Sequence, residues 1–166
     1  MKRLILVLLS YALCGAAEAN DVRTIIFVRH GEKASPTGDT KLSEKGLARA
    51  HALAESLRDI HFQKIYVSQF IRTQETAAPI AKLQGLTPQT MSTEKVDLLV
   101  EALRKTSSGT ATLVVYHGGN PIPQIVEKLG GGKIPEIPEE EFDRMVILTL
   151  PAQGKTHVLT LRYGGR

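Results

Sequence analysis

Short apolar runs typical of β-strands alternate with helix-like stretches along most of this 166-residue chain. The runs at 25–28, 64–68 and 112–116 are rich in β-formers, and each gives way to polar residues. Between them, apolar residues recur every three or four positions, which is the spacing of amphipathic helices. Parallel strands joined by helical crossovers require this order of elements. The alternation therefore predicts an α/β fold, a three-layer α/β/α sandwich around a mainly parallel sheet.

Four stretches have helical spacing, and a short strand is expected at 88–91. Ser43 is placed to cap the first helix, Gly85 to end the second, and the glycines at 130–132 to end the fourth. The apolar positions of the four helices are Leu47, Ala50, Ala54 and Leu57; Thr73, Ala77, Ile80 and Leu83; Val96, Leu99, Val100 and Leu103; and Ile122, Ile125, Val126 and Leu129.

The end of the chain changes character. A proline-punctuated stretch rich in glutamate, residues 135–143 and here called the acidic segment, precedes two β-rich runs at 144–150 and 156–162. The turn residues at 151–154 allow these runs to pair as a hairpin. We expect them to finish the sheet as antiparallel or edge strands.

The first nineteen residues have the pattern of a Sec-type signal peptide. Lys2 and Arg3 precede an apolar run at 4–13, which is too short to span a bilayer, and small residues precede an expected cleavage site before Asn20. This pattern predicts a periplasmic or secreted protein with one domain over 20–166 and no stable membrane insertion after cleavage. Cleavage would remove Cys14, the only cysteine, and with it any disulfide or thiolate chemistry.

The formal net charge of +4 is a mild bias toward anionic ligands. The chain has no basic run and little aromatic interleaving, so a nucleic-acid partner is not indicated. His51, His61 and His157 do not share metal-ligand spacing with a carboxylate, and we interpret them as surface or core residues. We expect no metal and no cofactor.

Polar residues gather after three of the predicted strands. Because parallel strands bring their carboxyl ends to one edge of a sheet, these residues are expected to meet there. The three groups are Arg29-His30-Gly31, the stretch from Ser68 through Arg72 to Thr76, and His117-Gly118-Gly119-Asn120. The guanidinium groups suit phosphate oxygens, and a neutral imidazole is a nucleophile. The spacing predicts a pocket in which His30 attacks phosphorus while Arg29, Arg72 and His117 stabilise the oxygens. Gly31, Ser68, Gly118 and Asn120 are candidate substrate contacts.

The sequence resembles the histidine phosphatase superfamily, also called phosphoglycerate mutase-like. Four motifs in the family's order carry the resemblance: Val28-Arg29-His30-Gly31-Glu32, Leu42-Ser43-Glu44-Lys45-Gly46, the stretch from Ser68 through Arg72-Thr73 to Glu75-Thr76-Ala77, and Val114-Val115-Tyr116-His117-Gly118. The resemblance implies a three-layer α/β/α fold with His30 as the phosphorylated nucleophile. It also implies a metal-independent phosphomonoesterase, mutase or related activity. The short stretch from 85 to 94 favours a phosphatase over a mutase.

Cleavage of a phosphoester requires protonation of the leaving oxygen. Glu94 falls where related enzymes often place this acid, with Glu101 as the weaker candidate, although a helix dipole alone also explains a carboxylate at such a position. The predicted function is hydrolysis of a small phosphomonoester or a phosphorylated envelope glycan. The alternatives are a phosphoanhydride or phosphoramidate hydrolase of the phosphohistidine type, and a non-catalytic phosphate-binding module.

Overall fold

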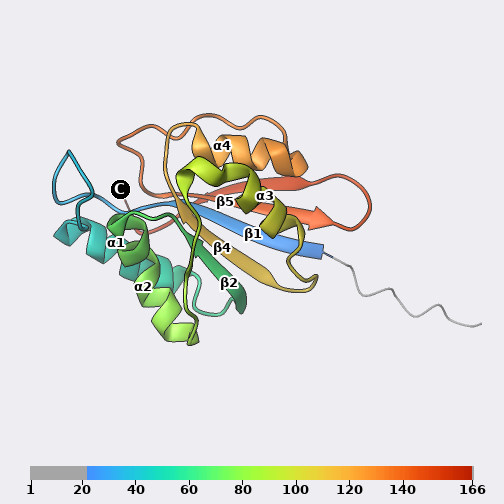
Figure 1. Cartoon of the computed structure of the whole chain (residues 1–166). Coiled ribbons are helices and arrows are strands. Elements are labelled where there is room, and N and C mark those ends of the chain that lie inside the picture. Colours follow the sequence, from blue (N-terminus) through green and yellow to red (C-terminus); the bar gives the residue numbers. More distant parts are fainter. Residues whose placement is uncertain (1–21, 166) are drawn as a thin grey trace, which may run out of the picture.

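The computed structural model describes residues 22–165, so the predicted signal peptide and its cleavage site lie outside the described residues. The described part contains a six-stranded sheet with the order β3-β2-β4-β1-β5-β6 (Figure 1). The strands are β1 (Val22–Arg29), β2 (Phe62–Val67), β3 (Gln89–Thr90), β4 (Ala111–Tyr116), β5 (Arg144–Pro151) and β6 (His157–Arg162).

The sheet is parallel through its first four strands and antiparallel at one side. β1 pairs in parallel with β4, β4 with β2, and β2 with β3, whereas β5 runs antiparallel to β1 and forms a hairpin with β6. This confirms the predicted mainly parallel sheet with a C-terminal hairpin. The register of β1 on β4 ends with Arg29 opposite Tyr116, so His30 and His117 leave the sheet side by side.

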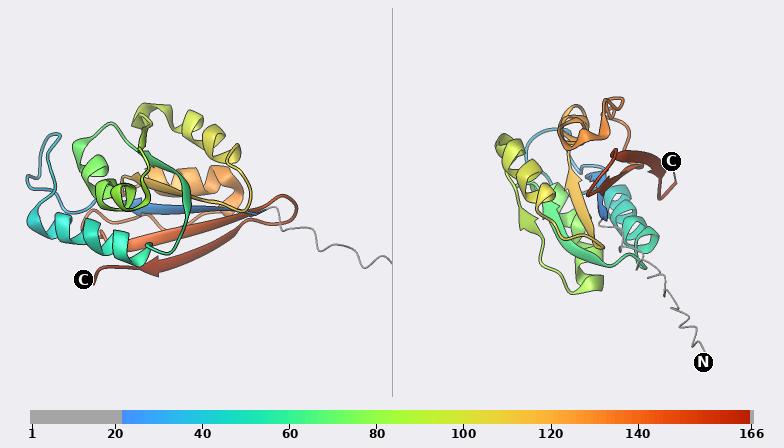
Figure 2. Two further views of the ribbon diagram at one scale, coloured as in Figure 1. Left: turned by 90° about the horizontal axis from the view of Figure 1, so that it is seen from below. Right: turned by 90° about the vertical axis from the view of Figure 1, so that its right-hand side faces the viewer.

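Helices cover both faces of the sheet, and α1 and α3 lie on opposite sides of it (Figure 2). One layer contains α1 (Glu44–Ser56) and α2 (Ile71–Gln84). The other contains α3 (Val96–Arg104), which follows the short 3-10 turn η1 (Thr93–Lys95), and α4 (Pro121–Val126), which continues into the π-type turn η2 (Glu127–Gly131).

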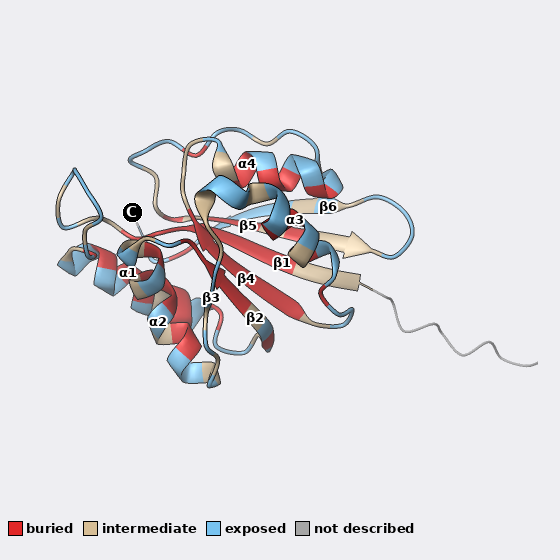
Figure 3. Ribbon diagram, viewed as in Figure 1, coloured by how far each residue is buried: buried red, intermediate tan, exposed pale blue. Residues whose placement is uncertain are grey.

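Alternation along β1 explains the two layers, because successive strand side chains point to opposite faces. Ile26 and Val28 pack with the first pair of helices, while Ile25 and Phe27 pack with the second. All four side chains are fully buried, and the central strands form the buried middle of the molecule (Figure 3).

The ends of the helices follow the sequence signals in most places. The Ser43 hydroxyl accepts from the Gly46 N–H to cap α1, and Gly85 ends α2 in the left-handed region at a φ of 65°. Leu47 and Leu83, assigned to the buried stripes, are instead 46% and 55% exposed. They lie in the first turn of α1 and the last turn of α2, away from the buried centres of the helices. No helix within residues 22–165 has the length and apolarity needed to cross a membrane.

Candidate active site

The carboxyl ends of β1, β2 and β4 bring four of the predicted residues together. His30 follows β1, Ser68 follows β2, His117 follows β4, and Arg72 lies in the first turn of α2. The His30 and His117 ring centroids are 5.3 Å apart, and Arg72 Nη2 lies 3.5 Å from His117 Nδ1. The arrangement expected from the strand ends is therefore present, with two imidazoles and a guanidinium in one cluster.

Backbone contacts orient His30. Its Nδ1 lies 2.8 Å from the Gly31 carbonyl oxygen, and a carbonyl only accepts, so Nδ1 carries the proton and Nε2 has a free lone pair. The Gly31 N–H in turn donates to Thr76 Oγ1 at 2.9 Å. Burial, aided by the charges of Arg29, Arg72 and Lys33 and opposed by the hydrogen bond to Gly31, lowers the pKa of His30 to about 4. At neutral pH the imidazole is therefore uncharged.

Two hydrogen bonds, one at each ring nitrogen, orient His117. Because arginine only donates, Nδ1 accepts from the guanidinium and Nε2–H donates to Ser68 Oγ at 2.8 Å. Burial, together with the nearby His30, Arg72 and Arg29, lowers the pKa of His117 to about 3. Ser68, predicted as a substrate contact, thus orients His117, and its hydroxyl also lies 3.0 Å from Thr73 Oγ1.

Arg72 has donors to spare. Its Nε and Nη1 are buried and have no hydrogen-bond partner among residues 22–165. The guanidinium stacks on Phe70 at 4.3 Å, and Nη1 is 3.7 Å from Asp39 Oδ1. Burial lowers the pKa of Arg72 and the Asp39 carboxylate opposes this shift. Two unpaired donors on a buried cation are suited to a phosphate.

Arg29 is bound mainly by the acidic segment. Its Nη1 donates to the carbonyls of Pro138 at 2.6 Å and Glu139 at 2.5 Å, and its Cζ lies 4.4 Å from the centre of the Phe142 ring. Its Nε is buried and has no partner within the described residues. Burial lowers the pKa of Arg29, and the charge of Glu139 is the largest effect opposing this shift.

The stretch after His117 also contacts Arg29. A Cβ on Gly118 would lie 2.8 Å from Arg29 Cδ, so the close approach of this side chain requires glycine. The Gly119 N–H donates to the Ile137 carbonyl at 2.7 Å, which anchors the start of the acidic segment. Asn120 is exposed at the beginning of α4 and its side chain does not cap the helix. The structure thus gives Gly118 a packing role, and the substrate contacts of Gly118 and Asn120 stay predictions.

Glu94 lies in η1 beside the loop that follows β2. Its neighbour Thr93 exchanges hydrogen bonds with the Gln69 side chain at 3.0 and 3.1 Å. The Glu94 residue is exposed, and its carboxylate contacts no hydrogen-bonding group among the residues described. Glu101, on α3, is exposed as well. The role of Glu94 as the acid stays a prediction.

The sequence did not predict the ion pair between Arg49 and Glu32, which supports the loop that follows β1. Arg49, only 5% exposed, binds the Glu32 carboxylate at 2.7 and 2.9 Å and also donates to the Gly165 carbonyl at 3.2 Å. The start of α1 packs closely against the backbone of this loop, because a Cβ on Gly46 would lie only 2.2 Å from the Glu32 carbonyl oxygen. An arginine on the otherwise apolar face of a predicted helix was the available signal, since buried charges are paired.

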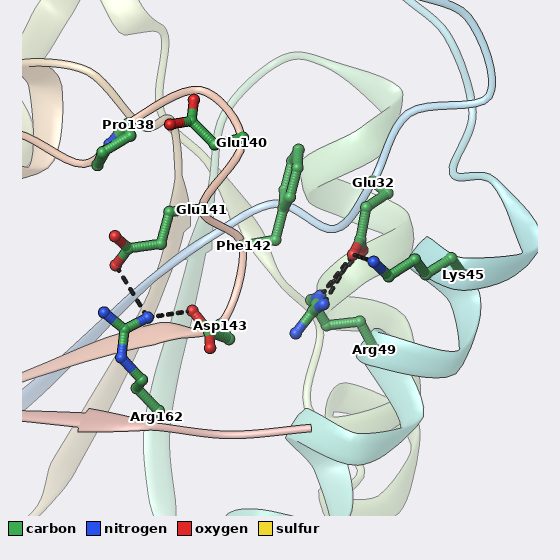
Figure 4. Close-up of a pocket in the computed structure, with 9 residues that line it drawn as sticks. All are labelled: Glu32, Lys45, Arg49, Pro138, Glu140, Glu141, Phe142, Asp143 and Arg162. Atoms are coloured by element: carbon green, nitrogen blue, oxygen red, sulfur yellow. Dashed lines mark hydrogen bonds and ion pairs between the residues drawn. The ribbon is translucent and has the colours of Figure 1, made fainter. Parts of the chain in front are cut away.

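A cavity of about 350 Å³ lies between this ion pair and the acidic segment (Figure 4). Phe142 lines it, and the centre of the same ring is 6.0 Å from that of His30. Phe142 is thus the contact between the cavity and the imidazole cluster, and neither histidine lines the cavity. Across residues 22–165, no three His, Asp, Glu or Cys side chains gather as a metal site would require.

Comparison with known proteins agrees with this geometry. Residues 25–94 match the model of the histidine phosphatase superfamily (branch 1). An uncharacterised protein of Mycobacterium tuberculosis is 41% identical over 70 residues, which are 38% of this chain and 35% of that protein. A PE-PGRS family protein of the same organism is 41% identical over 76 residues, or 40% of this chain and 13% of its own length. The chain thus covers about a third or less of these relatives.

Solved structures share the fold over most of both chains. A mycobacterial glucosyl-3-phosphoglycerate phosphatase has a TM-score of 0.66 at 16% identity, covering 87% of this chain and all of that one. The protein histidine phosphatase SixA, complexed with tungstate, has a TM-score of 0.68 at 19% identity, and the match covers 84% of this chain and 96% of that one. A phosphoglycerate mutase from Bacillus anthracis has a TM-score of 0.61 at 20% identity, and the match covers 87% of this chain and 94% of that one. The family model thus matches residues 25–94, and these neighbours show the same fold.

Proposed function

We propose that this protein hydrolyses phosphomonoesters through a phosphohistidine intermediate on His30. The observation that carries the proposal is the contact of His30 Nδ1 with the Gly31 carbonyl, which leaves Nε2 unprotonated beside His117 and Arg72. The free Nε and Nη1 donors of Arg72 and the free Nε of Arg29 are available to phosphate oxygens. A nucleophile and a set of cationic donors thus occupy one buried cluster.

The proposed reaction has two displacements. First, His30 Nε2 attacks phosphorus as the ester P–O bond breaks and the leaving oxygen takes up a proton from a general acid or from water, which gives phosphohistidine and an alcohol. Water then gives up a proton as its oxygen attacks the same phosphorus, the P–N bond breaks, and inorganic phosphate leaves. Arg72 and Arg29 stabilise the negative oxygens in both transition states. These side chains supply the positive charge that the reaction needs, so we propose that it proceeds without a metal.

We further propose a small phosphorylated substrate, or a phosphorylated envelope glycan, and export by the N-terminal signal pattern. The support for the substrate is the 350 Å³ cavity lined by charged side chains and by Phe142, whose ring centre is 6.0 Å from that of His30. The name of the glucosyl-3-phosphoglycerate phosphatase, a sugar phosphatase of the same fold, agrees with a polar substrate of this size.

The test is turnover of 4-nitrophenyl phosphate by the purified chain in the presence of EDTA. We expect wild-type hydrolysis and its loss in His30→Ala, together with acid-labile incorporation of ³²P into wild type only. His51→Ala is the matched control, because His51 is exposed on α1. Retention of full activity in His30→Ala would show that His30 is not the nucleophile.

A second candidate function follows from the exposure of Glu94. Phosphoramidates and phosphoanhydrides have better leaving groups and need less help from an acid, so a phosphohistidine-type substrate fits a site in which Glu94 faces solvent. A phosphohistidine peptide cleaved with a much higher kcat/KM than any phosphomonoester would favour this candidate. Vanadate binding without turnover of any substrate would instead indicate a non-catalytic phosphate-binding module.

A further inference from the structure

Asp39 lies beside the phosphate-binding side of Arg72. It belongs to the polar loop that follows β1, and its Oδ1 is 3.7 Å from Arg72 Nη1. Among residues 22–165, it is the only acidic side chain within ion-pair distance of Arg29, Arg72 or either clustered histidine. This loop carried no predicted site residue.

The carboxylate is held in place at one oxygen only. Oδ1 accepts the Ile71 N–H at 2.9 Å, so Asp39 caps α2, whose own N-cap residue, Phe70, has no capping side chain. Oδ2 has no hydrogen-bond partner in the described chain, and 39% of the side chain is exposed. Asp39 therefore has a fixed position, a free oxygen and contact with solvent protons.

The distance to Arg72 places Asp39 within reach of the ester oxygen. A phosphate oxygen that accepts from Nη1 would lie at about 2.8 Å from that nitrogen. This leaves room for another oxygen of the same phosphoryl group within hydrogen-bonding range of the carboxylate, whose Oδ1 is 3.7 Å from that nitrogen. Protonation of the leaving oxygen requires this kind of proximity.

Three other carboxylates near the cluster are already engaged, while those of Glu139 and Glu140, whose charges act on Arg29, form no ion pair within the described residues. Glu75 Oε2 accepts the Leu42 N–H at 2.7 Å, Arg49 binds Glu32, and Arg144 and Arg162 bind Glu141. Glu94 is exposed and contacts none of the clustered side chains. Asp39 combines proximity with a free oxygen.

We propose that Asp39 is the general acid and base of this site, a role that rests on the proposed phosphatase function. In the first step, the Asp39 carboxylic acid gives its proton to the leaving oxygen as the P–O bond breaks and His30 Nε2 bonds to phosphorus. In the second, the Asp39 carboxylate takes a proton from water as the water oxygen bonds to phosphorus and the P–N bond breaks. The carboxylic acid is thereby restored for the next turnover.

The test compares leaving groups in wild type and Asp39→Asn. The asparagine retains an oxygen that accepts the Ile71 N–H, so the α2 cap is preserved while the proton donor is lost. Substrates are 4-nitrophenyl, phenyl and 4-methylphenyl phosphate, with glycerol phosphate as the poorest leaving group. We expect Asp39→Asn to lose about 10²-fold more kcat/KM on glycerol phosphate than on 4-nitrophenyl phosphate, because only the poor leaving group needs a proton.

Asp59→Asn, at an exposed position after α1, is the matched control and should leave the leaving-group dependence unchanged. An equal loss on all substrates in Asp39→Asn would overturn the proposal, since it would show that Asp39 only positions Arg72. A selective loss in Glu94→Gln would assign the acid to Glu94 instead. No wild-type turnover on any phosphoester would refute the proposed function, and with it the role of Asp39. Wild-type turnover with an unchanged dependence in Asp39→Asn would refute the Asp39 role alone.

Discussion

Arg29 and Arg72 both lie at the proposed phosphate pocket, but the rest of the chain contacts them differently. Arg29 donates through Nη1 to backbone carbonyls of the acidic segment, and among residues 22–165 only its Nε is buried without a hydrogen-bond partner. Arg72 has two such atoms in the described chain, Nε and Nη1, and its side-chain neighbours are Phe70, His117 and Asp39. Both arginines lie at the carboxyl edge of the sheet, but they differ in how many of their N–H donors have hydrogen-bond partners in the described chain.

The difference separates a structural role from a ligand-binding one. A guanidinium that satisfies buried carbonyls stabilises the fold, and its removal leaves those carbonyls unpaired. A guanidinium with free buried donors is instead poised for an anion from outside the chain. We therefore expect Arg29 to contribute more to stability and Arg72 more to phosphate binding and turnover.

The largest effect is expected from Arg72→Ala on catalysis. Loss of the two free donors should lower kcat/KM for 4-nitrophenyl phosphate by about 10³-fold, because charged donors at developing oxyanions contribute on this scale. The free energy of unfolding should fall by about 1 kcal/mol at most, since the substitution removes only the 3.5 Å hydrogen bond to His117 and the contacts with Phe70 and Asp39. Arg58→Ala is the control, because the exposed Arg58 side chain, just after α1, pairs only with Glu55 among residues 22–165. A kcat/KM within tenfold of wild type would contradict the assignment.

The second effect is a dependence of stability on pH through the two histidines. An unfolded histidine takes up a proton near its ordinary pKa of 6.5, whereas the folded pKa values are lowered to about 4 for His30 and about 3 for His117. The unfolded chain therefore binds more protons below pH 6.5, and the free energy of unfolding falls as pH decreases. The loss between pH 7 and pH 5 is roughly 2 kcal/mol for each histidine at most.

Urea unfolding at pH 7, 6 and 5 measures this dependence. His117→Asn removes one of the two titrating groups and should reduce the loss between pH 7 and pH 5 by about half. His157→Asn, at an exposed position on β6, is the control and should reproduce the wild-type dependence. Parallel curves for wild type and His117→Asn would show that His117 is not held uncharged in the free protein.

The third effect is on stability at the Arg29 side. Arg29→Ala should lower the free energy of unfolding by about 2 kcal/mol, because it leaves the carbonyls of Pro138 and Glu139 without their charged donor. Its effect on kcat/KM should be smaller than that of Arg72→Ala. Equal destabilisation by Arg29→Ala and Arg72→Ala in urea titrations would contradict the assignment of Arg29, rather than Arg72, to stability.

Much of the site could be predicted from the sequence, because its residues follow strands. Arg29, His30, Ser68 and His117 each end a β-rich run, and the parallel order of the strands brings them together. The strand and helix order was predictable for the same reason, since a buried strand and an amphipathic helix each carry a periodic pattern. The exposed Leu47 and Leu83 show the limit of periodicity, which does not tell how far a helix extends beyond the buried part of its layer.

The contacts of the acidic segment were not predictable in this way. Its bonds to Arg29 use backbone carbonyls, which every residue has, so no side-chain pattern marks them. Asp39 was missed for a related reason. It lies in a loop rich in serine, proline and glycine, where an aspartate is typical of a turn, and its partners Ile71 and Arg72 are more than thirty residues away.

The smallest expected effect distinguishes the two phenylalanines that stack on the arginines. Phe70 lies 4.3 Å from Arg72 Cζ, and Phe142 lies 4.4 Å from Arg29 Cζ. Cation–π contacts contribute about 0.5–1 kcal/mol at such sites. Phe70→Ala should weaken inhibition by inorganic phosphate about threefold to fivefold, because little else orients Arg72.

Phe142→Ala should leave that inhibition within about twofold, because the carbonyls of Pro138 and Glu139 still hold Arg29. The inhibition constants of phosphate for the two variants, measured against 4-nitrophenyl phosphate, provide the comparison. A larger effect of Phe142→Ala than of Phe70→Ala would show that Arg29, despite its bonds to the acidic segment, is the arginine whose orientation governs phosphate binding.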